Sequence, residues 1–188
     1  MSFGSTAAPA MLLKSPREID VMARGGVILR GALNAMRDAV RPGVTTMELD
    51  AIGEAFIRSH AGAEPAFKGL YGFPGSVCIS INEEIVHGIP SRKRVLNDGD
   101  IVTVDVGVKL DGMYTDAAIT VPVGTIDAVT QRLLDVTERA LAAGIAAARP
   151  DNHVGDIGHA VQSVVEAEGF SVVRELVGHG VGFSPHEE

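Results

Sequence analysis

A pair of helices joined at an Arg-Pro dipeptide is predicted twice along the chain, which indicates an internal repeat. Arg41-Pro42 of the first unit aligns with Arg149-Pro150 of the second, and the same offset places Ala32-Leu33 on Ala140-Leu141 without a gap. Self-similarity on this scale is typical of domains that use one supersecondary unit more than once, although chance is the alternative explanation. We therefore predict an α/β (α+β) domain of two pseudo-symmetric halves, each made of two helices followed by strands.

The first unit contains clear signals for the ends of its helices. Ser15-Pro16 is typical of an N-cap followed by proline at the first helical position, and this helix should stop near Arg41-Pro42-Gly43. Thr45 and Glu48 have the spacing of a capping box, so a second helix should begin there and end before Gly62.

Strands are predicted after the helices of the first unit, but the second unit stops before its own strands are finished. Val77 to Ile81, Ile101 to Val108 and Met113 to Val121 are short and rich in β-branched residues, and Lys109 to Gly112 forms a hairpin turn between the last two. The sequence reaches only Glu188, so we expect the second half to be incomplete by roughly forty residues or more of sheet.

Composition indicates one cytoplasmic domain over residues 14–188, preceded by a flexible N-terminus over residues 1–13. The chain has 188 residues, of which 46% are hydrophobic, and this is enough for one sizeable core. Its net charge of −8 disfavours nucleic acid as the main ligand, and no apolar stretch is long enough for a membrane span. The single cysteine, Cys78, suits a reducing compartment, and Met1 to Ala10 lack the pattern of a secretory signal.

Asp105 lies within a run of valines, where an acidic residue is unfavourable unless it has a partner. Asp116 lies across the predicted hairpin, and for either centring of the turn the two carboxylates share one face of the sheet, directly opposed or diagonal. Two such charges repel unless a proton or a cation lies between them, so one or two divalent metals would suit the pair. The alternative is that Asp116 is a solvated hairpin residue and Asp105 a hydrogen-bonded core acid.

Three histidines occur in settings that suit a functional role. His179 lies between glycines that permit close backbone approach, His186 follows it in a Pro-His-Glu segment, and His87 stands at the end of a strand and loop. Taken singly, each such histidine is more often structural than catalytic. The other histidines lie on or beside predicted helices and are assigned structural roles: His60, His153 and His159.

Several separated segments together resemble the type I methionine aminopeptidases in order and spacing. They are Ser76 to Glu83, His87 to Pro90, Asp98 to Gly107, Thr115-Asp116, Glu166 to Glu175, Gly178 to Gly182 and His186 to Glu188. The resemblance covers the chain from Lys14 onward. It implies the pita-bread fold, itself two pseudo-symmetric halves, and an enzyme that removes the initiator methionine from nascent polypeptides when the next residue is small.

The resemblance also implies roles for individual residues. Asp105 and Asp116 match the first two metal-ligand aspartates, with Asp116 bridging two divalent ions (Co, Mn, Fe or Zn), and His179 matches the histidine ligand. His87 and His186 match the histidines that contact the substrate and stabilise the tetrahedral intermediate. The methionine pocket would be lined by Cys78, Phe73, Leu70 and Phe67, although an aromatic residue is more usual at the Leu70 position.

The family carries two further glutamate ligands on strands beyond the Gly-His-Gly segment, and the sequence stops before them. Glu187 and Glu188 belong to the His-Glu-Glu motif and do not replace those ligands. We therefore expect the 188-residue form to be a fragment with impaired or no activity, and the complete enzyme to be a monomer. Ribosome association fits the family role but has no visible basis in the sequence.

Two other functions remain open at this level. A proline-specific peptidase of the same fold shares the metal motif, but the segment from Cys78 to Pro90 and the short N-terminus before Lys14 favour the methionine enzyme. A non-catalytic binding protein on the same scaffold is disfavoured because the metal-ligand and substrate-contacting residues are retained.

Overall fold

The computed structural model describes residues 12–187, so nearly all of the N-terminal segment predicted to be flexible lies outside the described residues. Its elements, in chain order, are α1 (Pro16–Ala39), α2 (Thr46–Arg58), β1 (Ala63–Pro65), a 3₁₀ turn (Leu70–Gly72), β2 (Cys78–Ile81), β3 (Ile101–Leu110), β4 (Met113–Pro122), α3 (Ala128–Ala147) and α4 (Val154–Ala167). No helix in this part of the chain is long and apolar enough to cross a membrane.

The helices of the first unit begin where their capping residues predict. Ser15 and Glu18 form a complete capping box at the start of α1, with Pro16 as the first helical residue. Thr45 and Glu48 form the second box, at the start of α2. Each box satisfies backbone N–H groups that would otherwise lack a partner in the first turn, so these short polar patterns fix both helix starts.

An antiparallel sheet is built around β3, which pairs with β4 along one edge and with β2 and β1 along the other. Leu110 opposes Met113, so the turn between β3 and β4 contains only Asp111 and Gly112, with φ values of 47° and 85°. Positive φ at both positions is the geometry of the tight turns that match the twist of a hairpin. This turn fixes the register of the whole pair.

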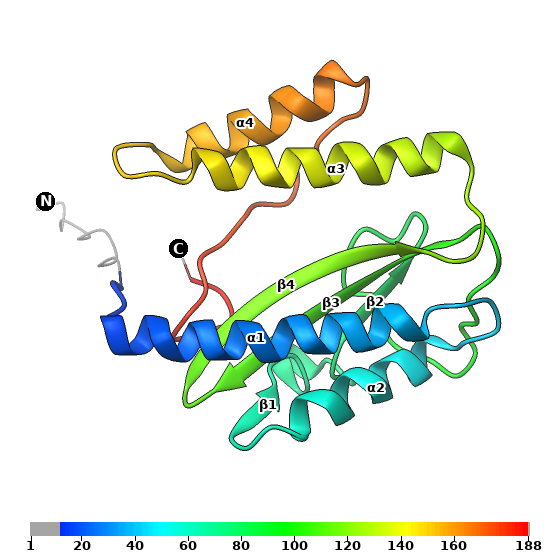
Figure 1. Cartoon of the computed structure of the whole chain (residues 1–188), viewed down its shortest axis with the longest axis horizontal. Helices are drawn as coiled ribbons and strands as arrows, with labels where there is room; N and C mark the ends of the chain where they lie inside the picture. Colours follow the sequence, from blue (N-terminus) through cyan, green and yellow to red (C-terminus); the bar gives the residue numbers. More distant parts are fainter. Residues whose placement is uncertain (1–11, 188) are drawn as a thin grey trace, which may run out of the picture.

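Successive side chains of β3 point alternately to two faces of the sheet, one packed in the core and one facing the pocket. Val102, Val104, Val106 and Val108 are fully buried on the face of β3 that packs against α1, and α2 packs beside α1 on β1 and β2 (Figure 1). The intervening Asp105 therefore points to the opposite face. The core is completed by side chains from the helices and flanking segments, including Leu29, Leu33, Met36, Leu49, Ile57, Val77, Ile79, Leu96 and Val123.

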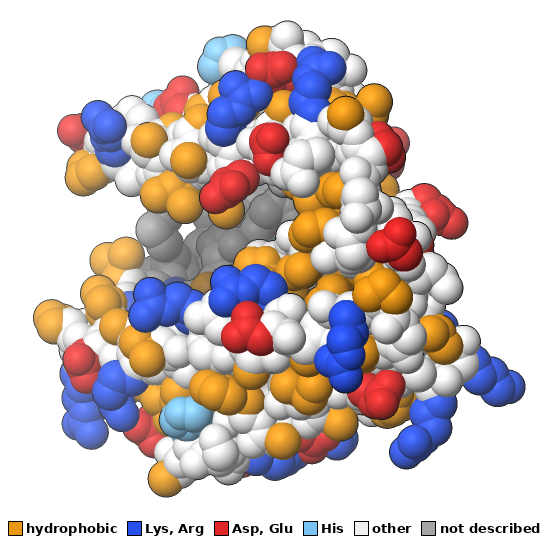
Figure 2. Space-filling model, turned by 45° about the vertical axis from the view of Figure 1, so that its right-hand side comes forward, with side chains coloured by type: hydrophobic (Ala, Val, Ile, Leu, Met, Phe, Trp, Pro, Cys, Tyr) orange, Lys and Arg blue, Asp and Glu red, His pale blue; other side chains and the backbone are white. Residues whose placement is uncertain are grey.

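The second unit repeats the helix pair, and among residues 12–187 no strand follows it. Figure 1 shows α3 and α4 as a separate layer above β4, where they pack chiefly on each other. Ala32 and Ala140 are buried at equivalent positions of the repeat, but Leu33 is 5% exposed and its equivalent Leu141 is 60% exposed. Figure 2 shows hydrophobic side chains and a hollow beneath this layer. Within residues 12–187, the second helix pair thus has no following sheet like the one that packs against the first pair.

Glu54 on α2 gives the fold a measurable acid sensitivity. Hydrogen bonds from Lys68 and Arg58, at 2.7 and 2.8 Å, lower the pKa of Glu54 to about 2 from 4.5. Because the pKa of Glu54 is lower in the folded than in the unfolded state, its ionised carboxylate stabilises the folded protein at pH values above about 4.5. This contribution to stability is lost as the pH falls from about 4.5 to 2. Since both cations are about half exposed, we expect Glu54→Gln to reduce the free energy of unfolding by only about 1 kcal/mol at pH 7.

Urea denaturation at pH 7 and pH 3 measures this effect. Glu138→Gln on the exposed face of α3 is the matched control, because Glu138 lies outside the ion pairs found among residues 12–187. Equal losses for the two variants at pH 7 would contradict the assigned role of Glu54.

Candidate active site

Every residue that the sequence placed in the site lines one cavity of about 850 Å³. The residues come from separate segments of the chain: the loop before β2, β2 itself, the loop after it, the β3–β4 hairpin and the segment after α4. They are Phe67, Leu70, Phe73, Cys78, His87, Asp105, Asp116, His179 and His186. The cavity lies on the face of β3 that carries Asp105, opposite the packed valines.

The two aspartates form a diagonal pair on neighbouring strands. Asp105 opposes Ala118 and Gly107 opposes Asp116, which confirms that the carboxylates share a face and settles their arrangement as diagonal. Burial raises the pKa of Asp105 well above its usual range, and the negative charge of Asp116 raises it further. The pair thus concentrates negative charge that a proton or a cation between the two carboxylates would relieve.

His179 approaches this pair from the segment after α4. Its Nε2 lies 3.9 Å from Oδ2 of Asp116, while its Nδ1 lies 2.8 Å from the carbonyl oxygen of Gly180. A carbonyl oxygen only accepts hydrogen bonds, so Nδ1 is a donor, and in the neutral ring Nε2 is then the atom with the lone pair. This is the tautomer of a histidine that binds a metal ion through Nε2.

A short loop from Gly180 to Glu187, closed by backbone hydrogen bonds, places His186 beside His179. Gly180 and Glu187 exchange two backbone hydrogen bonds of 2.8 Å, and the ring centroids of the two histidines are 4.6 Å apart. The amide of Tyr114 on β4 donates to the carbonyl oxygen of Gly182 at 2.7 Å and so attaches this loop to the sheet. Glu187 forms an ion pair with Lys14.

The chemistry of the donors fits a divalent metal ion. Two carboxylates and one imidazole nitrogen are oxygen and nitrogen ligands that suit Mn, Fe, Co or Zn. The contacts are pairwise, Asp105 with Asp116 and Asp116 with His179, and within the described part of the chain no three such side chains already surround one point.

Cys78 is part of the cavity lining. This residue opposes Asp105 across β2 and β3 and is 5% exposed. Burial, followed by the charges of Asp105 and Asp116, raises the pKa of the Cys78 thiol to about 12. The thiol is therefore protonated near neutral pH and serves as apolar lining, because a nucleophilic cysteine needs a lowered pKa.

Sequence reasoning missed several residues of the cavity wall: Tyr71, Gly72, Pro74, Val86, Ile89, Glu175, Leu176 and Val177. Tyr71 has a φ of 49°, is 90% exposed and stacks on His186 at 6.3 Å between ring centroids. It places an aromatic ring next to Leu70, the position where the family usually has one. Its neighbours Gly69 and Gly72, both with positive φ, were the available signal for a tight turn there.

The remaining histidines lie outside the cavity lining, as the sequence indicated. His60 contacts the carbonyl oxygen of Phe56 through Nδ1 at 2.9 Å. His153 precedes α4 and His159 lies on it beside Ser163.

Comparison with known proteins finds a family model, metallopeptidase family M24, that matches residues 20–188. Over 178 residues the chain is 50% identical to methionine aminopeptidase from Clostridium perfringens and 48% identical to methionine aminopeptidase 1 from Bacillus subtilis. Each match covers 95% of this chain and 71% of the relative.

Solved structures give the same pattern. Methionine aminopeptidase from Rickettsia prowazekii matches with a TM-score of 0.92 at 40% identity, covering 95% of this chain and 71% of that one. A Xaa-Pro dipeptidase from Bacillus anthracis matches with a TM-score of 0.81 at 22% identity and 48% coverage of its own length. The second likeness concerns the fold alone. The similarity to these enzymes establishes the pita-bread fold.

Proposed function

This chain belongs to metallopeptidase family M24, among the methionine aminopeptidases, and from that premise we propose that Asp105, Asp116 and His179 hold its divalent metal for removal of N-terminal methionine. The observation that carries the proposal is the single cavity, which gathers these ligands with two further histidines and an apolar wall. Residues so distant in the sequence meet only because the hairpin, the loop after β2 and the segment after α4 converge there.

The metal and the protein have separate tasks. When bound, a divalent ion supplies Lewis acidity at the scissile carbonyl and makes an activated water available near neutral pH. Asp105 and Asp116 provide the fixed negative charge that holds it, and Nδ1–H of His179, held by the Gly180 carbonyl, keeps Nε2 as the ligand atom.

His87 and His186 provide hydrogen-bond donors at the cavity wall. A ring N–H directed at the substrate carbonyl stabilises charge that develops only in the transition state. The apolar wall of Phe67, Leu70, Phe73 and Cys78 takes the methionine side chain, whose burial contributes about 1.5–3 kcal/mol. Binding of the side chain and activation of the peptide thus occur in one cavity, where Cys78 of the apolar wall lies opposite Asp105 across β2 and β3.

The finer features of the function are part of this proposal. They are a pair of metal ions rather than one, nascent chains with a small second residue as substrate, and a cytoplasmic, monomeric enzyme with two further glutamate ligands beyond Glu188. The resemblance that names the ligands supplies all of these features. Ribosome association belongs with them as an extension of the substrate assignment.

Hydrolysis of Met-Ala-Ser with added Mn²⁺ or Co²⁺ tests the proposal. The 188-residue chain is compared with a version extended to the natural stop codon, and we expect metal-dependent methionine release from the extended version, with little or none from the shorter one. The reason is that loss of two carboxylate ligands leaves a weak site.

An Ala-Pro peptide in the same assay separates the related activities. Preferential cleavage of Ala-Pro would favour a proline-specific peptidase, the fold relative at lower identity. No metal-dependent turnover of either peptide by either version would favour a non-catalytic scaffold.

A further inference from the structure

The loop after β2 holds His87 in an unfavourable backbone conformation. His87 has a φ of 60°, in the left-handed region that residues with a Cβ rarely adopt. Its side chain lines the cavity, while the loop around it has neither helix nor strand. Such a conformation persists only where the surrounding contacts enforce it.

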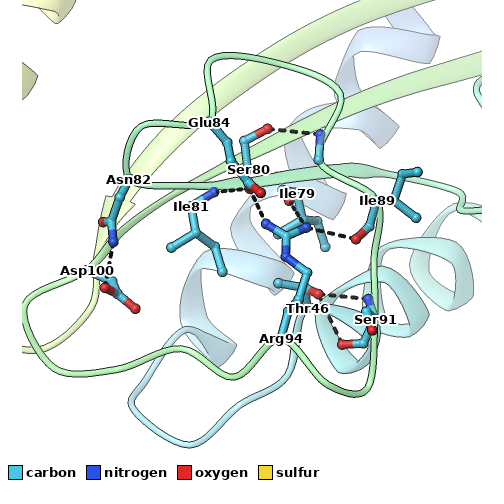
Figure 3. Close-up of polar contacts among 11 residues, drawn as sticks. Thr46, Ile79, Ser80, Ile81, Asn82, Glu84, Ile89, Ser91, Arg94 and Asp100 are labelled. Carbon is cyan, nitrogen blue, oxygen red and sulfur yellow. Dashed lines mark hydrogen bonds and ion pairs between the residues drawn. The ribbon is translucent and has the colours of Figure 1, made fainter.

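One guanidinium contacts the chain on both sides of His87. Nη1 of Arg94 donates to the carbonyl oxygens of Ile79 on β2, at 3.1 Å, and of Ile89, at 2.8 Å. Nη2 of Arg94 pairs with the carboxylate of Glu84, which in turn accepts the amide of Ile81 at 2.9 Å. Figure 3 shows Arg94 at the centre of these contacts.

The residue after His87 is fixed to β2 by its backbone. The amide of Ile79 donates to the carbonyl of Gly88 at 2.8 Å, and the amide of Gly88 donates to Oγ of Ser80 at 3.1 Å. On the other side of Gly88, Arg94 donates a hydrogen bond to the carbonyl oxygen of Ile89. His87 is therefore held between Glu84 and Ile89, both bound to one side chain.

Other contacts hold the ends of this loop independently of Arg94. Nδ2 of Asn82 donates to Asp100 at 2.8 Å, and the amide of Ser91 donates to Oγ1 of Thr46 at 2.9 Å (Figure 3). Loss of the guanidinium should therefore loosen the part of the loop that carries His87 while its ends stay attached.

We propose that Arg94 is a positioning residue that acts through His87, an inference that rests on the proposed function of the cavity. Arg94 is absent from the cavity lining and reaches the site only through the loop. Its planar fork contacts two carbonyl groups and one carboxylate at once, whereas the ammonium of a lysine is a compact charge that does not reproduce this fork. Arg94→Lys is therefore a partial replacement.

The test combines kinetics with a double-mutant cycle in the version extended to the natural stop codon. Arg94→Met is expected to lower kcat for Met-Ala-Ser about 10- to 100-fold with little change in KM, because a small displacement of a group that acts in the transition state affects the rate. Arg94→Lys should fall between this variant and the parent. Lys93→Met, an exposed neighbour of equal charge, should leave kcat unchanged.

The cycle identifies the route of the effect. In a His87→Ala background, Arg94→Met should cause less than about a twofold further loss, since the group it positions is gone. Additive losses would overturn the proposal, because they would show that Arg94 acts by another route.

Amide hydrogen exchange gives a second result that needs no turnover. The amides of Ile79 and Gly88 should exchange faster in Arg94→Met than in Lys93→Met, while the thermal midpoint of unfolding stays close to that of the parent. Unchanged exchange would overturn the proposal even if the chain proves to have another activity. If Arg94→Met fails to fold, the same comparison is made with Arg94→Lys.

Discussion

In the version extended to the natural stop codon, Asp105→Asn is expected to lower metal-dependent methionine release at least about 10³-fold, since a metal site contributes several kcal/mol to transition-state stabilisation and each 1.4 kcal/mol is tenfold in rate. Asn keeps the shape of the side chain but removes the charge that faces Asp116 across the hairpin. The other two proposed ligands among the described residues are Asp116 and His179, with Oδ2 and Nε2 3.9 Å apart. Steady-state kinetics and titration calorimetry with Mn²⁺ measure both losses.

Asp111→Asn is the matched control on the same hairpin. Asp111 is exposed, pairs with Arg24 and has a φ of 47°, a conformation that asparagine adopts readily. We expect this variant to retain metal binding and turnover. Without metal, Asp105→Asn should be at least as stable as the parent, because it removes one of two carboxylates that repel each other.

Retention of metal affinity by Asp105→Asn would contradict the ligand assignment. A lower stability in the metal-free state would contradict the repulsion between the two carboxylates. These outcomes are separate, so the ligand role and the electrostatic argument can fail independently.

The helix boundaries and the hairpin were predictable because their signals are local. Ser15 with Glu18 and Thr45 with Glu48 satisfy their own helix ends, and Asp111-Gly112 takes a turn geometry that few residue pairs tolerate. Because successive side chains of a strand point to opposite faces of the sheet, Asp105 and Asp116 were predicted to share one face for either register of the hairpin. Only the turn itself, seen in the structure, distinguished the diagonal from the direct arrangement.

Features that depend on distant partners were not predictable. β1 is a three-residue strand ending in Pro65, and it exists because β3 extends far enough to pair with it. The position of Tyr71 depends on a turn with two left-handed glycines beside it, and Arg94 finds partners on both sides of a loop. Spacing in the sequence carries no information about such contacts between segments.

Gly88→Ala is expected to reduce the free energy of unfolding by about 3 kcal/mol, although the substitution adds only one methyl group. A Cβ on Gly88 would lie 2.0 Å from the carbonyl oxygen of Ile79 and 2.8 Å from Cα of Ser80. Both are backbone atoms of β2, so the neighbour cannot move aside as the end of a flexible side chain would. Turnover by the version extended to the natural stop codon should fall by about 10²-fold or more, since His87 would be displaced with the loop.

Gly26→Ala provides a control of the same chemistry with the opposite expected sign. Gly26 lies inside α1, and a Cβ there would meet no atom within 4 Å. Alanine at this position should stabilise the chain by about 0.5–1 kcal/mol, because glycine loses more backbone entropy in a helix. Urea denaturation of both variants measures the difference. Parent-like stability of Gly88→Ala would show that β2 and the His87 loop are farther apart than this contact requires, and would remove the structural basis for fixing His87 from β2.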